Sequence, residues 1–389
     1  MGLTKKYYDN KWNNFIYVLE EVGDWKHAEQ LMDQVLDMRK KLLGAEHQDT
    51  LISMSDLSNT YSSQGKWNEA EQLNVQVLDM QKKLLGAEHP DTLISMSNLA
   101  STYLSQGKWN EAEQLNVQVL DMRKELFGAK HPDTLLSMSN LALVYSKKGK
   151  WNGAEQLNIQ VLDMRKELYG AEHPNTLISM SNLASIYSDQ GKWNEAEQLN
   201  VQVLDMRKKL LGAEHPNTLI SMLNLASIYS DQGKWNKADQ LNVQVLDMQK
   251  KILGAEHPYT LTSMSDLSMT YLRQGKWNEA EQLNVQVLDM RKKLLGAEHP
   301  DTLISMSNLA LVYSDQEKWN EAKQLNVQVL DMEKKLLGAE HPDTLITMSN
   351  LALVYSDQGK WDEVEQLNIQ MLDMKKKLQD AHQQKLEKT

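Results

Sequence analysis

The chain has 389 residues, a net charge of −11 and no cysteine. The acidic balance disfavours a general affinity for nucleic-acid phosphates or anionic membranes, and the lack of cysteine excludes disulfides, thiolate metal sites and a cysteine nucleophile. The sequence has neither a signal-peptide pattern nor a stretch of roughly 18 apolar residues that could span a membrane. These features lead us to expect a cytoplasmic protein that binds neither nucleic acid nor membrane.

Residues 1–23 differ from the rest of the chain. They carry Trp12 and Phe15 where later segments have Met and Leu at the corresponding places. Terminal units of a repeat array are commonly atypical, because one of their faces has no neighbour to cover it. We therefore expect residues 1–23 to form an atypical capping helix of a first repeat.

Residues 24–378 consist of a unit with a period of 42 residues. The markers of this period are Trp25, Trp67, Trp109, Trp151, Trp193, Trp235, Trp277, Trp319 and Trp361, and His47, His89, His131, His173, His215, His257, His299 and His341. A fixed period of 20–50 residues indicates a solenoid, in which each unit buries its apolar face against its neighbours. The remaining residues, 379–389, form a polar tail that either continues the last helix or is solvated.

The segment from Pro90 to His131 illustrates the folding of one unit. Pro90 suits the first turn of a helix, and Gly107 can end that helix in a left-handed conformation. Asn110 and Glu113 have the N-x-x-E spacing of a capping box and predict the start of a second helix, which Gly128 closes. The two predicted apolar faces are Leu93, Met96, Leu99, Ala100 and Tyr103, followed by Ala112, Leu115, Val119, Met122 and Leu126. The sequence therefore predicts an all-α fold of nine helix-turn-helix repeats.

Two strings carry a resemblance to a known family. They are GKWNEAEQLNVQVLDMRKKLLGAEHP, found at both 191–216 and 275–300, and LLGAEHPDTL. The unit resembles tetratricopeptide repeats of the 42-residue form found in kinesin light chains and in the C-terminal repeats of fungal NOD-like receptors. This resemblance implies a right-handed superhelical solenoid whose first helices line a concave groove.

The periodic aromatic, histidine and acidic residues have structural interpretations. Stacked helices lie about 8–10 Å apart, whereas nitrogens that share a zinc ion must be within roughly 4 Å. Histidines one repeat apart therefore cannot share a metal, and we expect them to cap helices. The tryptophans are expected to wedge helix against helix, and the repeated carboxylates to lie on a solvated helix face. We expect no catalytic site, metal or cofactor.

One face of the first helix is the candidate binding surface. An asparagine recurs on the side away from the apolar face, at Asn98, Asn140, Asn182, Asn224, Asn308 and Asn350. An amide can both donate and accept hydrogen bonds, and in the resembling families the matching asparagine contacts a peptide backbone. The alternative is a structural bond to a neighbouring helix.

Other positions on the same face vary between repeats over a nearly constant frame. The variable candidates are Ser101, Leu143, Lys147, Asp189, Asp231 and Arg273. Such variation is what partner recognition would produce, although the position of Arg123 also varies, which we interpret as drift at the surface.

The leading hypothesis is a monomeric, non-enzymatic scaffold that holds a protein or extended peptide in its groove, as in the recognition arm of a fungal NOD-like receptor. One alternative is a kinesin light chain-type cargo adaptor, although the groove carries more aspartate than an acidic cargo peptide would favour. Another is a self-assembling structural rod without a foreign ligand.

Overall fold

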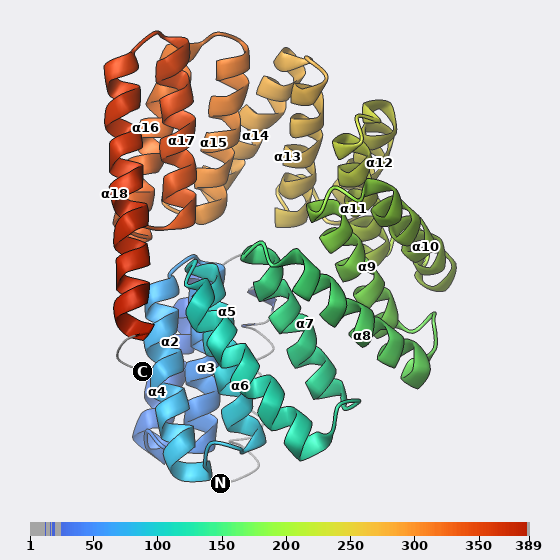
Figure 1. Cartoon of the computed structure of the whole chain (residues 1–389), viewed down its shortest axis with the longest axis vertical. Coiled ribbons are helices and arrows are strands. Elements are labelled where there is room, and N and C mark those ends of the chain that lie inside the picture. The colour runs from blue at the N-terminus through green and yellow to red at the C-terminus, as the bar shows by residue number, and fades with distance from the viewer. Residues whose placement is uncertain (1–11, 13–15, 17, 20–24, 387–389) are drawn as a thin grey trace. The chain divides into compact units, whose positions relative to one another are not determined.

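The computed structural model describes residues 12, 16, 18–19 and 25–386, so most of the expected capping helix lies outside the described residues. Within these ranges every regular element is a helix, which confirms the all-α prediction (Figure 1). The helices are α2 (Trp25–Leu43), α3 (Gln48–Ser63), α4 (Trp67–Leu85), α5 (Pro90–Ser105), α6 (Trp109–Phe127), α7 (Pro132–Lys147), α8 (Trp151–Tyr169), α9 (Pro174–Asp189), α10 (Trp193–Leu211), α11 (Pro216–Asp231), α12 (Trp235–Ile252), α13 (Pro258–Arg273), α14 (Trp277–Leu295), α15 (Pro300–Asp315), α16 (Trp319–Leu336), α17 (Pro342–Asp357) and α18 (Trp361–Leu386).

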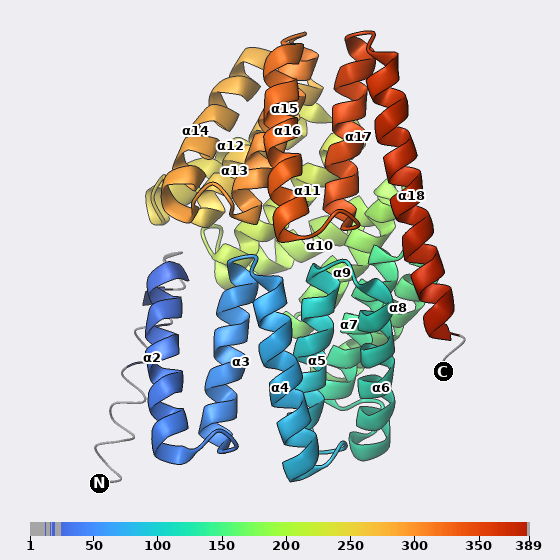
Figure 2. The same cartoon turned by 90° about the vertical axis from the view of Figure 1, so that its left-hand side faces the viewer.

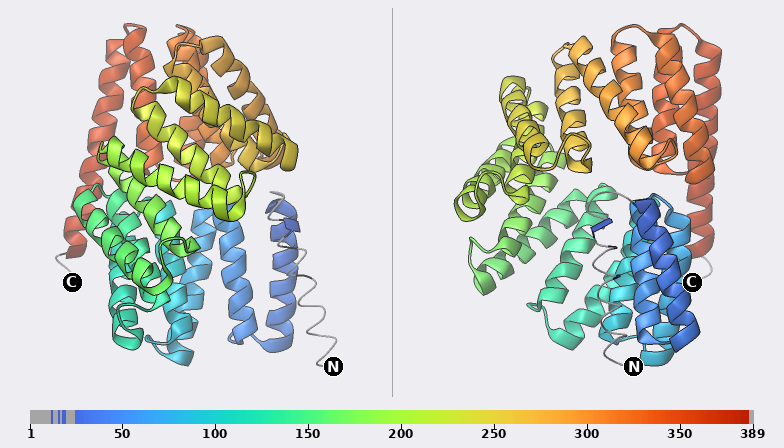
Figure 3. Two further views of the ribbon diagram at one scale, coloured as in Figure 1. Left: turned by 90° about the vertical axis from the view of Figure 1, so that its right-hand side faces the viewer. Right: turned by 180° about the vertical axis from the view of Figure 1, so that it is seen from behind.

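The helices follow one another as first and second helices of successive repeats, beginning with α2 as a second helix. The chain forms two compact units, residues 1–263 and 264–389. Consecutive helices contact each other from α2 to α12 in the first unit (Figure 2) and from α14 to α18 in the second (Figure 3). The last helix runs through residue 378 to Leu386, so the polar tail is helical over most of its length.

A histidine precedes each first helix from α3 to α17, and in all of these except α3, which begins at Gln48, a proline follows it. In α5 the Nδ1 of His89 accepts a hydrogen bond from the backbone N–H of Asp91 at 3.2 Å, and Pro90 occupies the first turn. Proline is suited to this place because its missing N–H would have had no partner within the helix. The predicted capping role of the periodic histidines is confirmed at His47, His89, His131, His173, His215, His299 and His341.

The turn between the two helices needs a left-handed residue. Gly107 has φ of 71°, which lets the N–H of Lys108 donate to the carbonyl of Tyr103 at 2.8 Å. Glu317 takes the place of this glycine in α15–α16 and has φ of 60°. A side chain in this region is strained, because Cβ approaches the backbone closely.

The predicted capping box is wrong. The second helix begins at Trp109, so its N-cap residue is Lys108, two residues before the predicted Asn110, and Lys108 makes no capping hydrogen bond with its side chain. The side chains of Asn110 and Glu113 instead bind lysines of the next repeat, as described below.

Each repeat contributes a compact apolar cluster to the core. Leu93, Met96, Leu99 and Val119 are buried together with Leu78 of the preceding repeat, so each cluster joins neighbouring repeats as a solenoid requires. Two sequence-based expectations fail here. Leu126, in the last turn of α6, is 44% exposed. The wedge expectation fails for five tryptophans, which begin their helices at the surface and are more than 40% exposed: Trp151, Trp193, Trp235, Trp277 and Trp361.

Candidate binding face of the first helices

The first helices form one layer of the array. In the first unit α3 contacts α5, α7 contacts α9, and α9 contacts α11, in addition to the contacts between consecutive helices. When the helices of one layer lie closer to each other than those of the other layer, the array curves toward the closer-packed layer. The first helices therefore form the inner layer of this unit, and the side of them that faces away from the core is called the first-helix face below.

A row of exposed apolar side chains runs along the first-helix face. In the first unit its members are Ile52, Ile94, Leu136, Ile178 and Ile220, and the same position in two first helices of the second unit carries Ile304 and Ile346; all seven are 44–57% exposed. An isolated apolar residue on a protein surface is common, but here an exposed apolar residue recurs at the same position in almost every repeat. The sequence prediction did not include this row among the site residues. The sequence pattern could have revealed it, because these apolar residues fall outside the predicted buried face of their helix.

The predicted asparagines lie on the same face. Asn182 is exposed, and Asn98, Asn140, Asn224, Asn308 and Asn350 are partly buried. In the described part of the chain none of these six amides forms a side-chain hydrogen bond, whereas Asn116 on the second helix is buried and donates to the Ala112 carbonyl at 2.9 Å. The row thus presents donors and acceptors to solvent.

The variable candidates are also accessible. Ser101, Leu143, Lys147, Asp189 and Arg273 are exposed, and Asp231 is partly buried. Asp189 is held in place by the preceding repeat, since the hydroxyl of Ser146 donates to its Oδ2 at 2.8 Å. The face therefore combines an apolar row and an amide row that recur in most repeats with positions whose size and charge change from repeat to repeat.

The position of Arg123 is not a surface site, and its interpretation as surface drift is wrong. Arg123 is 5% exposed, and its Nη1 donates to the Ser137 hydroxyl at 2.8 Å and to the Asp133 carbonyl at 3.1 Å. Burial lowers the pKa of this guanidinium, and the charge of Asp133 opposes that effect. Arg39, Arg165, Arg207 and Arg291 make the same pair of bonds in their own repeats.

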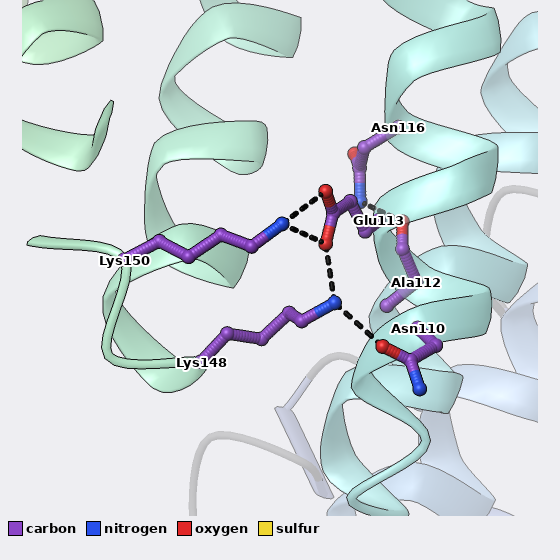
Figure 4. Close-up of polar contacts among 6 residues, drawn as sticks. All are labelled: Asn110, Ala112, Glu113, Asn116, Lys148 and Lys150. Carbon is purple, nitrogen blue, oxygen red and sulfur yellow. Dashed lines mark hydrogen bonds and ion pairs between the residues drawn. The ribbon is translucent and has the colours of Figure 1, made fainter. Parts of the chain in front are cut away.

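A lysine–glutamate contact joins most repeats to the next, between the turn of one repeat and the second helix of the repeat before it. Lys150 Nζ lies 2.7 Å from one carboxylate oxygen of Glu113 and 3.0 Å from the other, and Lys148 binds the same carboxylate (Figure 4). Lys148 also reaches Asn110 Oδ1 at 2.5 Å. Partial burial raises the pKa of Glu113, but the hydrogen bonds from the two lysines outweigh it and the pKa is lowered. The expectation of a solvated carboxylate face is therefore wrong at Glu113, which joins neighbouring repeats.

The described residues contain no group of three or more histidines and carboxylates arranged to hold a metal ion. Among the same residues, no helix combines the length and apolar character needed to cross a membrane.

Comparisons with known proteins agree with this architecture. One tetratricopeptide repeat family model matches residues 7–83, 133–209, 182–251, 222–293 and 273–335. A second model with the same description matches residues 92–133 and 344–383. A search of curated proteins gives no match. Among solved structures, nearly identical TPR-like repeats from Podosopora anserina, named after the kinesin light chain, are 35% identical over 54% of this chain and 99% of theirs, with a TM-score of 0.46.

Two further structures cover almost the whole chain. A Rap protein complexed with Competence and Sporulation Factor is 13% identical over 95% of this chain and 98% of its own, with a TM-score of 0.59. The apo form of the quorum sensor NprR from B. thuringiensis is 17% identical over 94% and 97%, with a TM-score of 0.58. At these identities the two share the fold. The repeat geometry and the family models together establish that this chain belongs to the tetratricopeptide repeat family.

Proposed function

We propose that the chain is a non-enzymatic scaffold that binds an extended peptide or protein segment along its first-helix face. The observation that carries this proposal is the row of asparagine amides without side-chain partners beside the exposed apolar row. A peptide backbone offers alternating N–H and C=O groups, which an amide can satisfy from either side. The apolar row supplies contact area that is removed from water on binding.

The variable residues would then determine which segment binds. Lys147 and Arg273 supply cations in two repeats, whereas Asp189 and Asp231 supply anions at the same position in others. Charges at such positions act mainly on selectivity and association rate. An acidic ligand is disfavoured where the aspartates lie, which counts against the kinesin light chain-type cargo adaptor.

The more specific form of the proposal is a recognition arm like that of a fungal NOD-like receptor, acting as a monomer in the cytoplasm. It is supported by repeats that are nearly identical in their frame and differ on the first-helix face. The Rap protein of the same fold, crystallised with Competence and Sporulation Factor, supports binding of a foreign molecule in general. The self-assembling rod makes a different prediction, because sedimentation velocity would then reveal polymers that grow with concentration.

The amide row can be tested directly once a pull-down has identified a ligand. Replacing Asn140, Asn182 and Asn224 together with alanine removes hydrogen bonds worth about 0.5–1.5 kcal/mol each, so binding should weaken by roughly 1.5–4.5 kcal/mol. Helix content should not fall, since alanine is the better helix former. Isothermal titration calorimetry measures the affinity, and circular dichroism measures the helix content.

The matched control replaces Gln118, Gln160 and Gln202 with alanine. These amides are exposed on second helices and should be dispensable for binding. Unchanged affinity of the asparagine variant would place the ligand elsewhere, and a loss of affinity that merely follows a lower melting temperature would make the asparagines structural.

A further inference from the structure

The second repeat lacks the buried guanidinium that five other repeats contain. At the position of Arg123 it has Gln81, which is 9% exposed and makes neither of the two hydrogen bonds that the arginines make. Glutamine is shorter than arginine and does not reach the corresponding acceptors, the carbonyl of Asp91 and the hydroxyl of Ser95. Its own Oε1 is buried and has no hydrogen-bond partner.

A pocket of about 230 Å³ lies above Gln81 and opens between α3 and α5. Its walls include Ile52 and Ile94 from the exposed apolar row and Asn98 from the amide row. The pocket is therefore continuous with the surface that the proposed function assigns to peptide binding.

The polar lining of this pocket is that of a cation site. Asp56, Asp91, Ser95 and Gln81 line it together with the neutral side chains of Gln48, Ser55, Asn59 and Asn98, and none of its lining residues is a lysine or arginine. Gln48 Nε2 donates to Asp91 Oδ2 at 3.3 Å, so that carboxylate is held toward the pocket by a neutral donor. Carboxylates, the Ser95 hydroxyl and the Gln81 Oε1 are all hydrogen-bond acceptors. An unsatisfied buried acceptor carries a desolvation penalty that a donor from a ligand would relieve.

We propose that this pocket is a subsite for an arginine side chain of the bound peptide. In the second repeat the ligand's guanidinium takes the place of a buried guanidinium of the chain itself. Five other repeats have that group, from Arg39, Arg123, Arg165, Arg207 and Arg291. The planar guanidinium carries several donors in a fixed arrangement, and in the first and third repeats the serine hydroxyl and the backbone carbonyl already accept from this group. Ile52 and Ile94 flank the aliphatic part of the incoming side chain.

This subsite deepens the proposed function and rests on it for its biological role, but its test does not require the rest of the binding face. The probe is N-acetyl-arginine N-methylamide, and the neutral comparison is the corresponding citrulline compound, which has nearly the same shape. Binding is followed on the full chain by the methyl NMR signals of Ile52 and Ile94. We expect the arginine probe to shift both signals and to bind about tenfold more tightly than the citrulline probe, or more.

Two substitutions remove the subsite in different ways. Gln81→Arg fills the pocket with the guanidinium that five other repeats already accommodate, so it should fold and abolish the arginine preference. Gln76→Arg adds the same charge on the exposed side of α4 and should leave the preference unchanged. Asp56→Asn introduces the residue found at this place in most other repeats and should reduce the preference several-fold, and it keeps the test valid if Gln81→Arg is unstable.

Three results would overturn the subsite: equal binding of both probes, equal loss in the Gln76→Arg and Gln81→Arg variants, or no shift of the two methyl signals because water alone occupies the pocket. The probe has no extended backbone to meet the amide row. Failure of the asparagine variants to weaken peptide binding would therefore contradict the proposed function and leave this result standing.

Discussion

Glu333 offers a sharp test of how the repeats are held together, because it places a carboxylate where most repeats have a buried arginine. It is 7% exposed and its Oε2 has no hydrogen-bond partner. Burial raises the pKa of Glu333 from 4.5 to about 7, the charge of Asp343 adds to this, and a hydrogen bond from Thr347 opposes it. The ionised side chain therefore destabilises the fold.

The sign of the effect follows from linkage. A carboxyl whose pKa is higher in the folded chain binds protons more tightly there, so the free energy of unfolding falls as pH rises from about 4.5 to about 7. A shift of one pKa unit corresponds to about 1.4 kcal/mol, so the destabilisation at pH 8 reaches about 3 kcal/mol. At pH 5 most of it is absent, because the folded chain keeps the proton.

Glu333→Gln removes the charge and should stabilise the chain by about 2–3 kcal/mol more at pH 8 than at pH 5. Glu333→Arg should stabilise further at pH 8, because its guanidinium can donate to the Thr347 hydroxyl and the Asp343 carbonyl as Arg291 does to Ser305 and Asp301. The measurement is the urea midpoint of each variant relative to the parent chain at both pH values. Other titrating groups are common to both proteins and cancel in the difference.

Glu340→Gln is the matched control, since it removes an exposed carboxylate from the same unit and should shift neither midpoint by more than a few tenths of a kcal/mol. The reasoning is refuted if Glu333→Gln stabilises equally at both pH values, or if it destabilises at pH 8. Either result would mean that Glu333 is solvated or paired in solution.

Three further predictions concern the frame. Glu317→Gly should raise the melting temperature, because it relieves a left-handed side chain that costs on the order of 1 kcal/mol; an unchanged or lower value would show that this turn tolerates the residue. Deletion of Gly191–Gln232, one full period, should leave a folded helical protein by circular dichroism, since stability in an array sums over neighbours; an insoluble product would contradict that additivity. Glu113→Gln should weaken the contact with Lys148 and Lys150 and lower the melting temperature by a few degrees, about 1 kcal/mol, more at low salt than at high salt; equal effects at both salt concentrations would argue against an ionic contribution.

The sequence was sufficient for features that depend on neighbours within one repeat. The His89–Pro90 start and the Gly107 turn follow from backbone chemistry over a few residues, and both are confirmed. The position of the asparagine row on the helix also follows from helical periodicity, although its role in binding stays a prediction.

Features that depend on the register between repeats could not be predicted in this way. Lys150 meets Glu113 across 37 residues of chain, and nothing in the local pattern distinguishes that contact from a solvated carboxylate or a capping box. The position of Arg123 looked like variable surface for the same reason, because its partners Asp133 and Ser137 belong to the next repeat. The pocket lined by Gln81 likewise could not be predicted from the sequence, since its walls come from α3, α4 and α5 of neighbouring repeats.

Oxidation of the buried core methionines can report how often each repeat opens locally. Met54, Met96, Met138, Met180, Met222, Met264, Met306 and Met348 lie one per repeat and are at most 3% exposed. Oxidation to the sulfoxide requires access to the sulfur, so a dilute oxidant can modify each of these residues only when its repeat opens locally. Because the chain contains no cysteine to compete for the oxidant, peptide mass spectrometry at successive times would yield an opening rate for each repeat. A bound ligand should slow oxidation in the repeats that it covers, which would map its footprint along the array.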